Sequence, residues 1–132
     1  MAELAFRDGV MEQIRLRESR YQEGAYLFVL AALEYAQASL QLRRHITGQE
    51  LARACRDVAL ERYGVMARIV LERWGITTTD DIGAVVFTLV ELRFLASLPS
   101  DTRDQFGEVF DFVEAFEQQY PWNSTALLTA ER

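Results

Sequence analysis

Residues 43–81 constrain the fold more than any other stretch, because they carry several helix boundary signals in close succession. Thr47 stands three residues before Glu50, which is the spacing of a capping box, where each side chain accepts a hydrogen bond from the other residue's backbone amide. Gly64 and Gly75 then stand where helices are expected to end. This stretch therefore predicts successive helices with almost no loop between them.

Helical periodicity of the apolar residues extends on both sides of this stretch. It predicts helices over residues 3–16, about 22–43, 48–63, 65–74, 78–92 and about 112–119. The helix at about 22–43 carries apolar residues on two faces, and such a helix is buried by two neighbours. We therefore expect a mainly α fold: a compact bundle of five or six helices around this central helix.

Residues 94–112 fit two interpretations. Apolar segments at 94–98 and 106–112 flank a polar stretch that contains Pro99. This pattern is typical of a β-hairpin with a polar tip, or of a loop that leads into another helix. We expect a small hairpin or extended excursion here, which would give the bundle a winged-helix-like arrangement.

The length of 132 residues predicts a single globular domain over 1–120, followed by a loosely ordered C-terminal tail over 121–132. The longest apolar run, 25–33, is far shorter than the roughly 20 residues that a bilayer requires, so we expect no membrane segment. One cysteine and the absence of a secretory leader pattern at the start favour a reducing, cytoplasmic location.

The charge distribution argues against nucleic acid as a partner. The net charge is −6, and residues 76–132 carry ten acids and three bases. If the chain were a winged helix, its recognition helix would begin with Asp80 and Asp81, which would place two carboxylates against phosphates. A winged-helix-like DNA-binding regulator is therefore an alternative to the leading interpretation, and not the first choice.

No residue pattern predicts catalysis, a cofactor or a metal. Cys55 and His45 are the only cysteine and histidine, so one chain cannot assemble a Cys and His metal cluster. We expect Cys55 to be a buried small hydrophobe and His45 to be a cation at a helix junction, which excludes a catalytic pair between them. The acids from Asp101 to Glu114 do not have the spacing of a calcium loop, and no glycine-rich phosphate loop is present. An undetected small enzyme is the second alternative.

Four segments of the chain resemble the successive blocks of a family: RYQEGAYLFVLAALEYA, RHITGQELARACRDVALERYG, VLERWGITTTDDIGAVVFTLVE and DFVEAF. This is the uncharacterised bacterial Minf-prefix family of small acidic proteins. The resemblance covers about residues 20–117 and implies common ancestry, without any catalytic residue to carry over. The chain departs from the family pattern at Val65, where other members tend to have proline, and at Ile82, where they have phenylalanine.

We therefore expect a non-enzymatic protein-protein interaction module or a small homo-oligomeric domain. All 14 basic residues are arginines, which make planar, bidentate contacts with carboxylates. The residues predicted to contact a protein partner or a second copy are Arg53, Arg56, Arg62 and Arg68, on the middle helices. The acidic face of the C-terminal segment is the other candidate surface.

Overall fold

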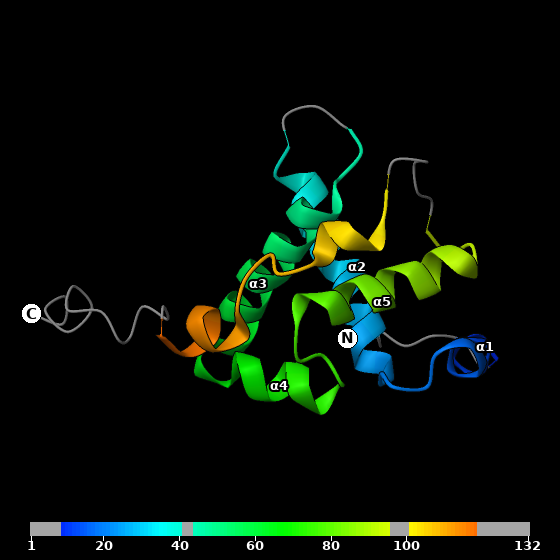
Figure 1. The fold of residues 1–132 in the computed structure, drawn as a ribbon, viewed down its shortest axis with the longest axis horizontal. Coiled ribbons are helices and arrows are strands. Elements are labelled where there is room, and N and C mark those ends of the chain that lie inside the picture. Colours follow the sequence, from blue (N-terminus) through cyan, green and yellow to red (C-terminus); the bar gives the residue numbers. More distant parts are fainter. Residues whose placement is uncertain (1–8, 41–43, 96–100, 119–132) are drawn as a thin grey trace, which may run out of the picture.

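The computed structural model describes residues 9–40, 44–95 and 101–118, and all regular structure within these ranges is helical (Figure 1). The α-helices are α1 (Val10–Arg17), α2 (Glu23–Ala38), α3 (Gly48–Tyr63), α4 (Ala67–Arg73) and α5 (Thr79–Glu91). Three shorter helical turns are the 3-10 helices η1 (Gly64–Met66) and η2 (Arg103–Phe106) and the π-helical η3 (Glu114–Gln118). The predicted mainly α fold is confirmed.

Helix α2 is the central helix, as predicted, and packs chiefly against α3 and α5 (Figure 1). Its fully buried side chains include Ala25, Val29 and Ala32, which form one stripe, and Tyr26, which lies about 100° further round the helix. The predicted end at about residue 43 is wrong, because α2 ends at Ala38 and residues 41–43 lie outside the described ranges.

The predicted boundary signals of the middle helices are confirmed. The Glu50 amide donates to the Thr47 hydroxyl at 3.1 Å, and the Thr47 amide donates to the Glu50 carboxylate at 2.9 Å. Thr78 is the N-cap of α5. Gly64 and Gly75 have positive φ angles of 54° and 101°, which glycine adopts at little cost where a helix ends.

The predicted hairpin at 94–112 is not supported: the described part of this range contains η2 and irregular backbone but no strand, and 96–100 lie outside it. The physical reason is that this segment bonds to the starts of two helices. The Gln105 side chain accepts from the Gly48 amide at 3.0 Å, and the Val109 amide donates to the Thr79 hydroxyl at 3.2 Å. Its polar groups thus pair with α3 and α5, where a hairpin would pair them with each other.

Phe106 fixes the position of this segment. It is buried, and it packs where both neighbouring helices carry glycine. A Cβ on Gly48 would lie 2.9 Å from the Phe106 ring, and a Cβ on Gly83 would lie 3.0 Å from it. These two glycines therefore form the contact surface on which η2 rests.

The helix predicted over 65–74 is present, but it buries other residues than its apolar pattern suggested. Ala67 and Leu71 of α4 are buried, whereas Val65, Met66 and Ile69 are exposed.

At the ends of the chain, α1 begins at Val10, and the last predicted helix is a helical turn over 112–118. Residues 3–8 of the first predicted helix and the predicted tail at 121–132 lie outside the described ranges. Within those ranges, every helix is too short or too polar to cross a membrane.

Candidate functional site

The four arginines predicted to contact a partner, Arg53, Arg56, Arg62 and Arg68, do not form one surface. Arg53 and Arg62 are both exposed on α3, but they are nine residues apart. Nine residues are two and a half turns at about 3.6 residues per turn, so the two side chains leave opposite sides of the helix. Neither makes an ion pair within the described part of the chain.

The other two arginines are engaged within the chain. The Arg56 guanidinium lies over the Phe110 ring, 5.9 Å from its centroid. Arg68 donates to Glu72 at 2.8 Å and to Glu117 at 2.9 Å, and these two carboxylates hold the pKa of Arg68 above its usual range. A partner would have to displace these contacts, so Arg56 and Arg68 are the weaker candidates of the four.

An apolar surface that the arginine pattern did not predict lies on η1 and α4. Val65, Met66 and Ile69 are 54%, 48% and 54% exposed, and we call them the α4 patch. Residues three and four apart on a helix lie on the same side, so Ile69 is adjacent to both others. Arg73 follows Ile69 by four residues and is also exposed. The helical spacing of these apolar residues can be read from the sequence, but a helix face buried in the core has the same spacing.

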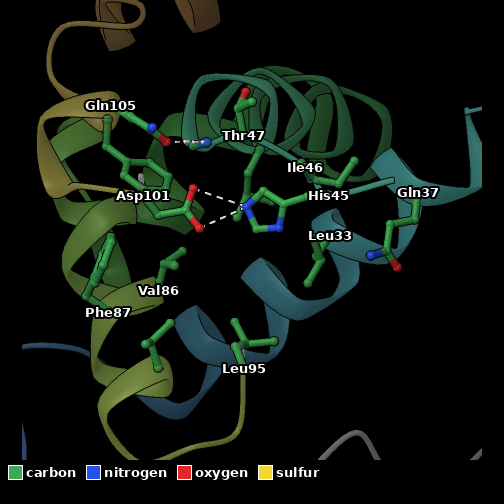
Figure 2. Close-up of a pocket in the computed structure, with 14 residues that line it drawn as sticks. Leu33, Gln37, His45, Ile46, Thr47, Val86, Phe87, Leu95, Asp101 and Gln105 are labelled. Carbon is green, nitrogen blue, oxygen red and sulfur yellow. Dashed lines mark hydrogen bonds and ion pairs between the residues drawn. The ribbon is translucent and has the colours of Figure 1, made fainter. Parts of the chain in front are cut away.

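A cavity of about 270 Å³ lies where α2, α3, α5 and the 101–106 segment meet (Figure 2). Its walls are mainly aliphatic and aromatic, and they include Leu33 of α2, Leu51 of α3, Val86 and Val90 of α5 and Phe106 of η2. Polar side chains come from the residues that precede α3 and from the 101–105 segment, and Gln37 of α2 contributes a further polar group to the lining. The cavity therefore combines an apolar interior with a polar edge.

His45 and Asp101 form that polar edge (Figure 2). The His45 Nε2 atom lies 2.8 Å from Asp101 Oδ2 and 3.1 Å from Oδ1. The Asp101 side chain is only 12% exposed, and that of His45 is 35% exposed. A carboxylate so far removed from water is stabilised by a hydrogen bond to a ring N–H.

Local structure explains how this pair is positioned. The capping box at Thr47 fixes the chain just before α3, and the neighbouring Ile46 is buried, so His45 is held at the cavity edge. On the other side, the bond from the Gly48 amide to Gln105 fixes the segment that carries Asp101. Sequence reasoning placed His45 at a helix junction but gave no indication of Asp101, because 56 residues separate the two.

The pair leaves one ring nitrogen available for a ligand. Because the Asp101 carboxylate accepts from Nε2–H, a neutral His45 ring presents Nδ1 as a hydrogen-bond acceptor. Figure 2 shows this nitrogen on the side of the ring away from Asp101, and no hydrogen bond to it is seen within the described ranges. Such a nitrogen can accept a hydrogen bond or a proton.

The surroundings of His45 contain no activated nucleophile in the part of the chain that the structure describes. Thr47 lines the cavity, but its hydroxyl points away from His45 and accepts the capping bond from the Glu50 amide (Figure 2). Cys55 is fully buried, as predicted, and burial raises the pKa of its thiol far above the usual range. In the same residues, no group of three or more His, Cys, Asp or Glu side chains is arranged to hold a metal ion.

Comparison of the chain with protein-family models, curated proteins and solved structures gave no match. The resemblance to the Minf-prefix family remains a prediction from the sequence. Function is therefore inferred from the geometry of the α4 patch and of the cavity.

Proposed function

We propose that this chain is a non-enzymatic interaction module that docks an acidic, amphipathic helical segment of a partner protein on the α4 patch. The observation that carries this proposal is the joint exposure of Val65, Met66 and Ile69 on one short element. Single exposed apolar residues are ordinary on protein surfaces, but adjacent ones mark interaction sites. A short helix of a partner, with its apolar residues three and four apart, fits such a surface.

The core does not explain this exposure. Helix α4 already contributes Ala67 and Leu71 to the interior, and both are buried. Polar residues at 65, 66 and 69 would therefore leave the core intact and would lower the apolar area exposed to water. The apolar side chains at these positions are consistent with a contact that another molecule completes.

Charge favours an acidic partner over a second copy of the chain. Exposed charges of both signs flank the patch: Glu61 and Arg62 at the end of α3, and Glu72 and Arg73 on α4. Glu72 is paired with Arg68 at 2.8 Å, whereas Arg73, beside Ile69, makes no ion pair in the described part of the chain. A symmetric dimer through the patch brings the same surface of two copies together, so like charges would meet. Carboxylates on a partner segment would instead pair with these arginines, while the apolar contact supplies most of the affinity.

The alternative of a DNA-binding regulator receives little support from the arrangement of α5. A recognition helix needs an exposed face to enter the major groove. Most of α5 is buried, including Ile82, Val85 and Leu89, and its exposed residues are Asp80 and Glu91. The alternative of a small enzyme is supported only by the His45–Asp101 pair, which lacks a neighbouring nucleophile in the described ranges.

The test is a titration of the isotope-labelled protein with two synthetic helical peptides that share an apolar face. One peptide carries Glu on its polar face and the other carries Lys. We expect the Glu peptide to shift the amide signals of η1 and α4 with an affinity at least several-fold greater than that of the Lys peptide. Equal affinities, or shifts that map to other helices, would overturn the proposal.

A matched pair of variants locates the contact. The double variant Met66→Asp, Ile69→Asp is expected to abolish binding of the Glu peptide. Leu16→Asp is the control, because Leu16 of α1 is 86% exposed and lies outside the α4 patch. Light scattering of the same proteins tests whether a second copy occupies the patch. A wild-type dimer that the double variant dissociates would assign the patch to a second copy and contradict the acidic-partner proposal.

A further inference from the structure

We infer that the cavity beside the His45–Asp101 pair is a binding site for a small, neutral, mainly apolar molecule whose single hydroxyl group donates a hydrogen bond to His45 Nδ1. This inference is independent of the proposed partner docking. The cavity is lined by α2, α3, α5 and η2, whereas the α4 patch belongs to η1 and α4.

The size and walls of the cavity set the class of ligand. Its volume is about 270 Å³. An apolar protein cavity of about 150 Å³ is large enough to hold benzene, so this one accommodates a single ring with a short substituent. Leu33, Val86 and Val90 offer such a body apolar contacts and no hydrogen bonds. The ligand is therefore an apolar ring or short branched chain, and not a sugar or a nucleotide.

The polar edge selects the functional group. Asp101 accepts from His45 Nε2 through both of its oxygens, at 2.8 and 3.1 Å. This contact favours the ring tautomer with a proton on Nε2, so Nδ1 accepts hydrogen bonds. A hydroxyl group of the ligand can donate a hydrogen bond to Nδ1. An ether or a hydrocarbon of the same shape leaves Nδ1 without a partner when it displaces water.

Asp101 also disfavours a ligand that carries a carboxylate. Such a ligand would place a second negative charge on the other side of the His45 ring, and Asp101 is too little exposed for water to screen the repulsion well. The nearest arginine in sequence, Arg44, does not compensate, because its guanidinium donates to Glu50 at 2.7 and 3.0 Å. The geometry therefore favours a neutral hydroxyl compound, such as an alkylphenol, over an aromatic acid.

Three matched probes test this inference on the intact chain: 4-ethylphenol, ethylbenzene and 4-ethylbenzoate. Dissociation constants are measured from amide chemical shifts of the isotope-labelled protein. We expect 4-ethylphenol to bind about two- to tenfold more tightly than ethylbenzene, which is the effect of one neutral hydrogen bond. We expect 4-ethylbenzoate to be the weakest of the three. The shifts should map to the cavity-lining parts of α2, α3 and α5.

Variant His45→Phe isolates the hydrogen bond. It keeps a ring at the cavity edge but removes Nδ1, so 4-ethylphenol and ethylbenzene should then bind with about equal affinity. This ratio is informative even when the variant changes the affinity for both probes. Arg53→Gln is the control, because Arg53 is exposed and does not line the cavity, and it should keep the wild-type ratio.

Filling the cavity tests the location of the site. Val86→Phe should abolish binding of both neutral probes. If that variant does not fold, Leu33→Phe, at a partly exposed position in the cavity wall, provides the same test. Three results would overturn the inference: no binding of 4-ethylphenol up to its solubility limit, a phenol preference that survives His45→Phe, or shifts confined to the α4 patch.

Discussion

The Tyr21 hydroxyl donates a hydrogen bond to Asp81, a residue 60 positions later in the chain. The same carboxylate accepts from the backbone amides of Thr77 and Thr78 at 2.8 and 3.1 Å, so it also caps the start of α5. Beside it, the Gln22 amide donates to the Trp74 carbonyl at 3.0 Å. These bonds join the segment before α2 to the segment before α5.

Removing the Tyr21 hydroxyl is expected to destabilise the fold. In Tyr21→Phe, Asp81 loses one donor while it remains partly buried, and a carboxylate that loses such a bond costs about 1–3 kcal/mol. The free energy of unfolding from urea titrations at pH 7 provides the measurement.

Tyr26→Phe is the matched control for that substitution. The Tyr26 hydroxyl is buried without a well-formed hydrogen bond, and the Thr88 hydroxyl, with which it interacts, donates at 2.8 Å to the Ala84 carbonyl. Replacing a buried, unpaired hydroxyl is expected to leave stability unchanged or to raise it by up to about 1 kcal/mol. A larger loss in Tyr26→Phe than in Tyr21→Phe would contradict both assignments.

Stability should fall as the pH drops from about 5 towards 2, because over this interval the unfolded chain takes up a proton on Glu50 more readily than the folded chain does. The hydrogen bond from Arg44, helped by that from the Thr47 amide, lowers the pKa of Glu50 in the folded chain to about 2. The ordinary value in an unfolded chain is about 4.3. A group whose pKa is lower in the folded state stabilises that state above its unfolded pKa, and this contribution is lost as the pH falls through the folded pKa.

Glu50→Gln separates this contribution from those of other acids. The difference in unfolding free energy between wild type and variant should be largest at pH 7 and should shrink towards pH 2, as seen in urea titrations at several pH values. Asp81 contributes in the same direction: burial acts to raise its pKa, but the hydrogen bonds from Tyr21, Thr77 and Thr78 outweigh burial and lower it. A difference that does not change with pH would exclude the Arg44–Glu50 contact as its source.

The boundaries of the middle helices could be predicted because their causes are local. Thr47 and Glu50 are three residues apart, and Gly64 and Gly75 each act on the turn that precedes them. The exposure of Ile69 could not be predicted in the same way. An apolar residue at helical spacing has the same pattern whether its face meets the core or a partner, and only the packing of α4 decides between them.

The cavity could not be predicted from the sequence, because it depends on pairs that are distant in the chain. His45 meets Asp101 only because the segment after α5 returns to the start of α3. Phe106 makes that return possible by packing on Gly48 and Gly83, which lie in different helices. Gly48 is the first residue of α3 and Gly83 lies inside α5, but no local rule requires glycine at either position, and neither pairing leaves a periodic signal.

Cys55 is expected to be unreactive in the folded protein. Its side chain is fully buried, and burial raises the pKa of the thiol, so almost no thiolate is present to react. A thiol reagent such as Ellman's reagent should modify it only when the chain unfolds. The modification rate should therefore rise in Tyr21→Phe by about tenfold for every 1.4 kcal/mol of stability lost, as absorbance kinetics measure. Rapid modification of the wild type under native conditions would show that α3 opens locally.

Gly83→Ala is expected to destabilise the fold, although alanine is favoured over glycine within a helix by about 1 kcal/mol. The added Cβ would lie 3.0 Å from three atoms of Phe106, which is buried and has little room to move. We expect a net loss of about 1–2 kcal/mol in urea titrations, of the kind seen when a packed core is overfilled. In a Phe106→Ala background Cγ and Cδ2 are removed and only Cβ remains near the added methyl group, so the loss caused by Gly83→Ala should shrink by about 1 kcal/mol or more. This coupling in a double-mutant cycle is expected for direct contact between the two residues, and additive effects would disprove it.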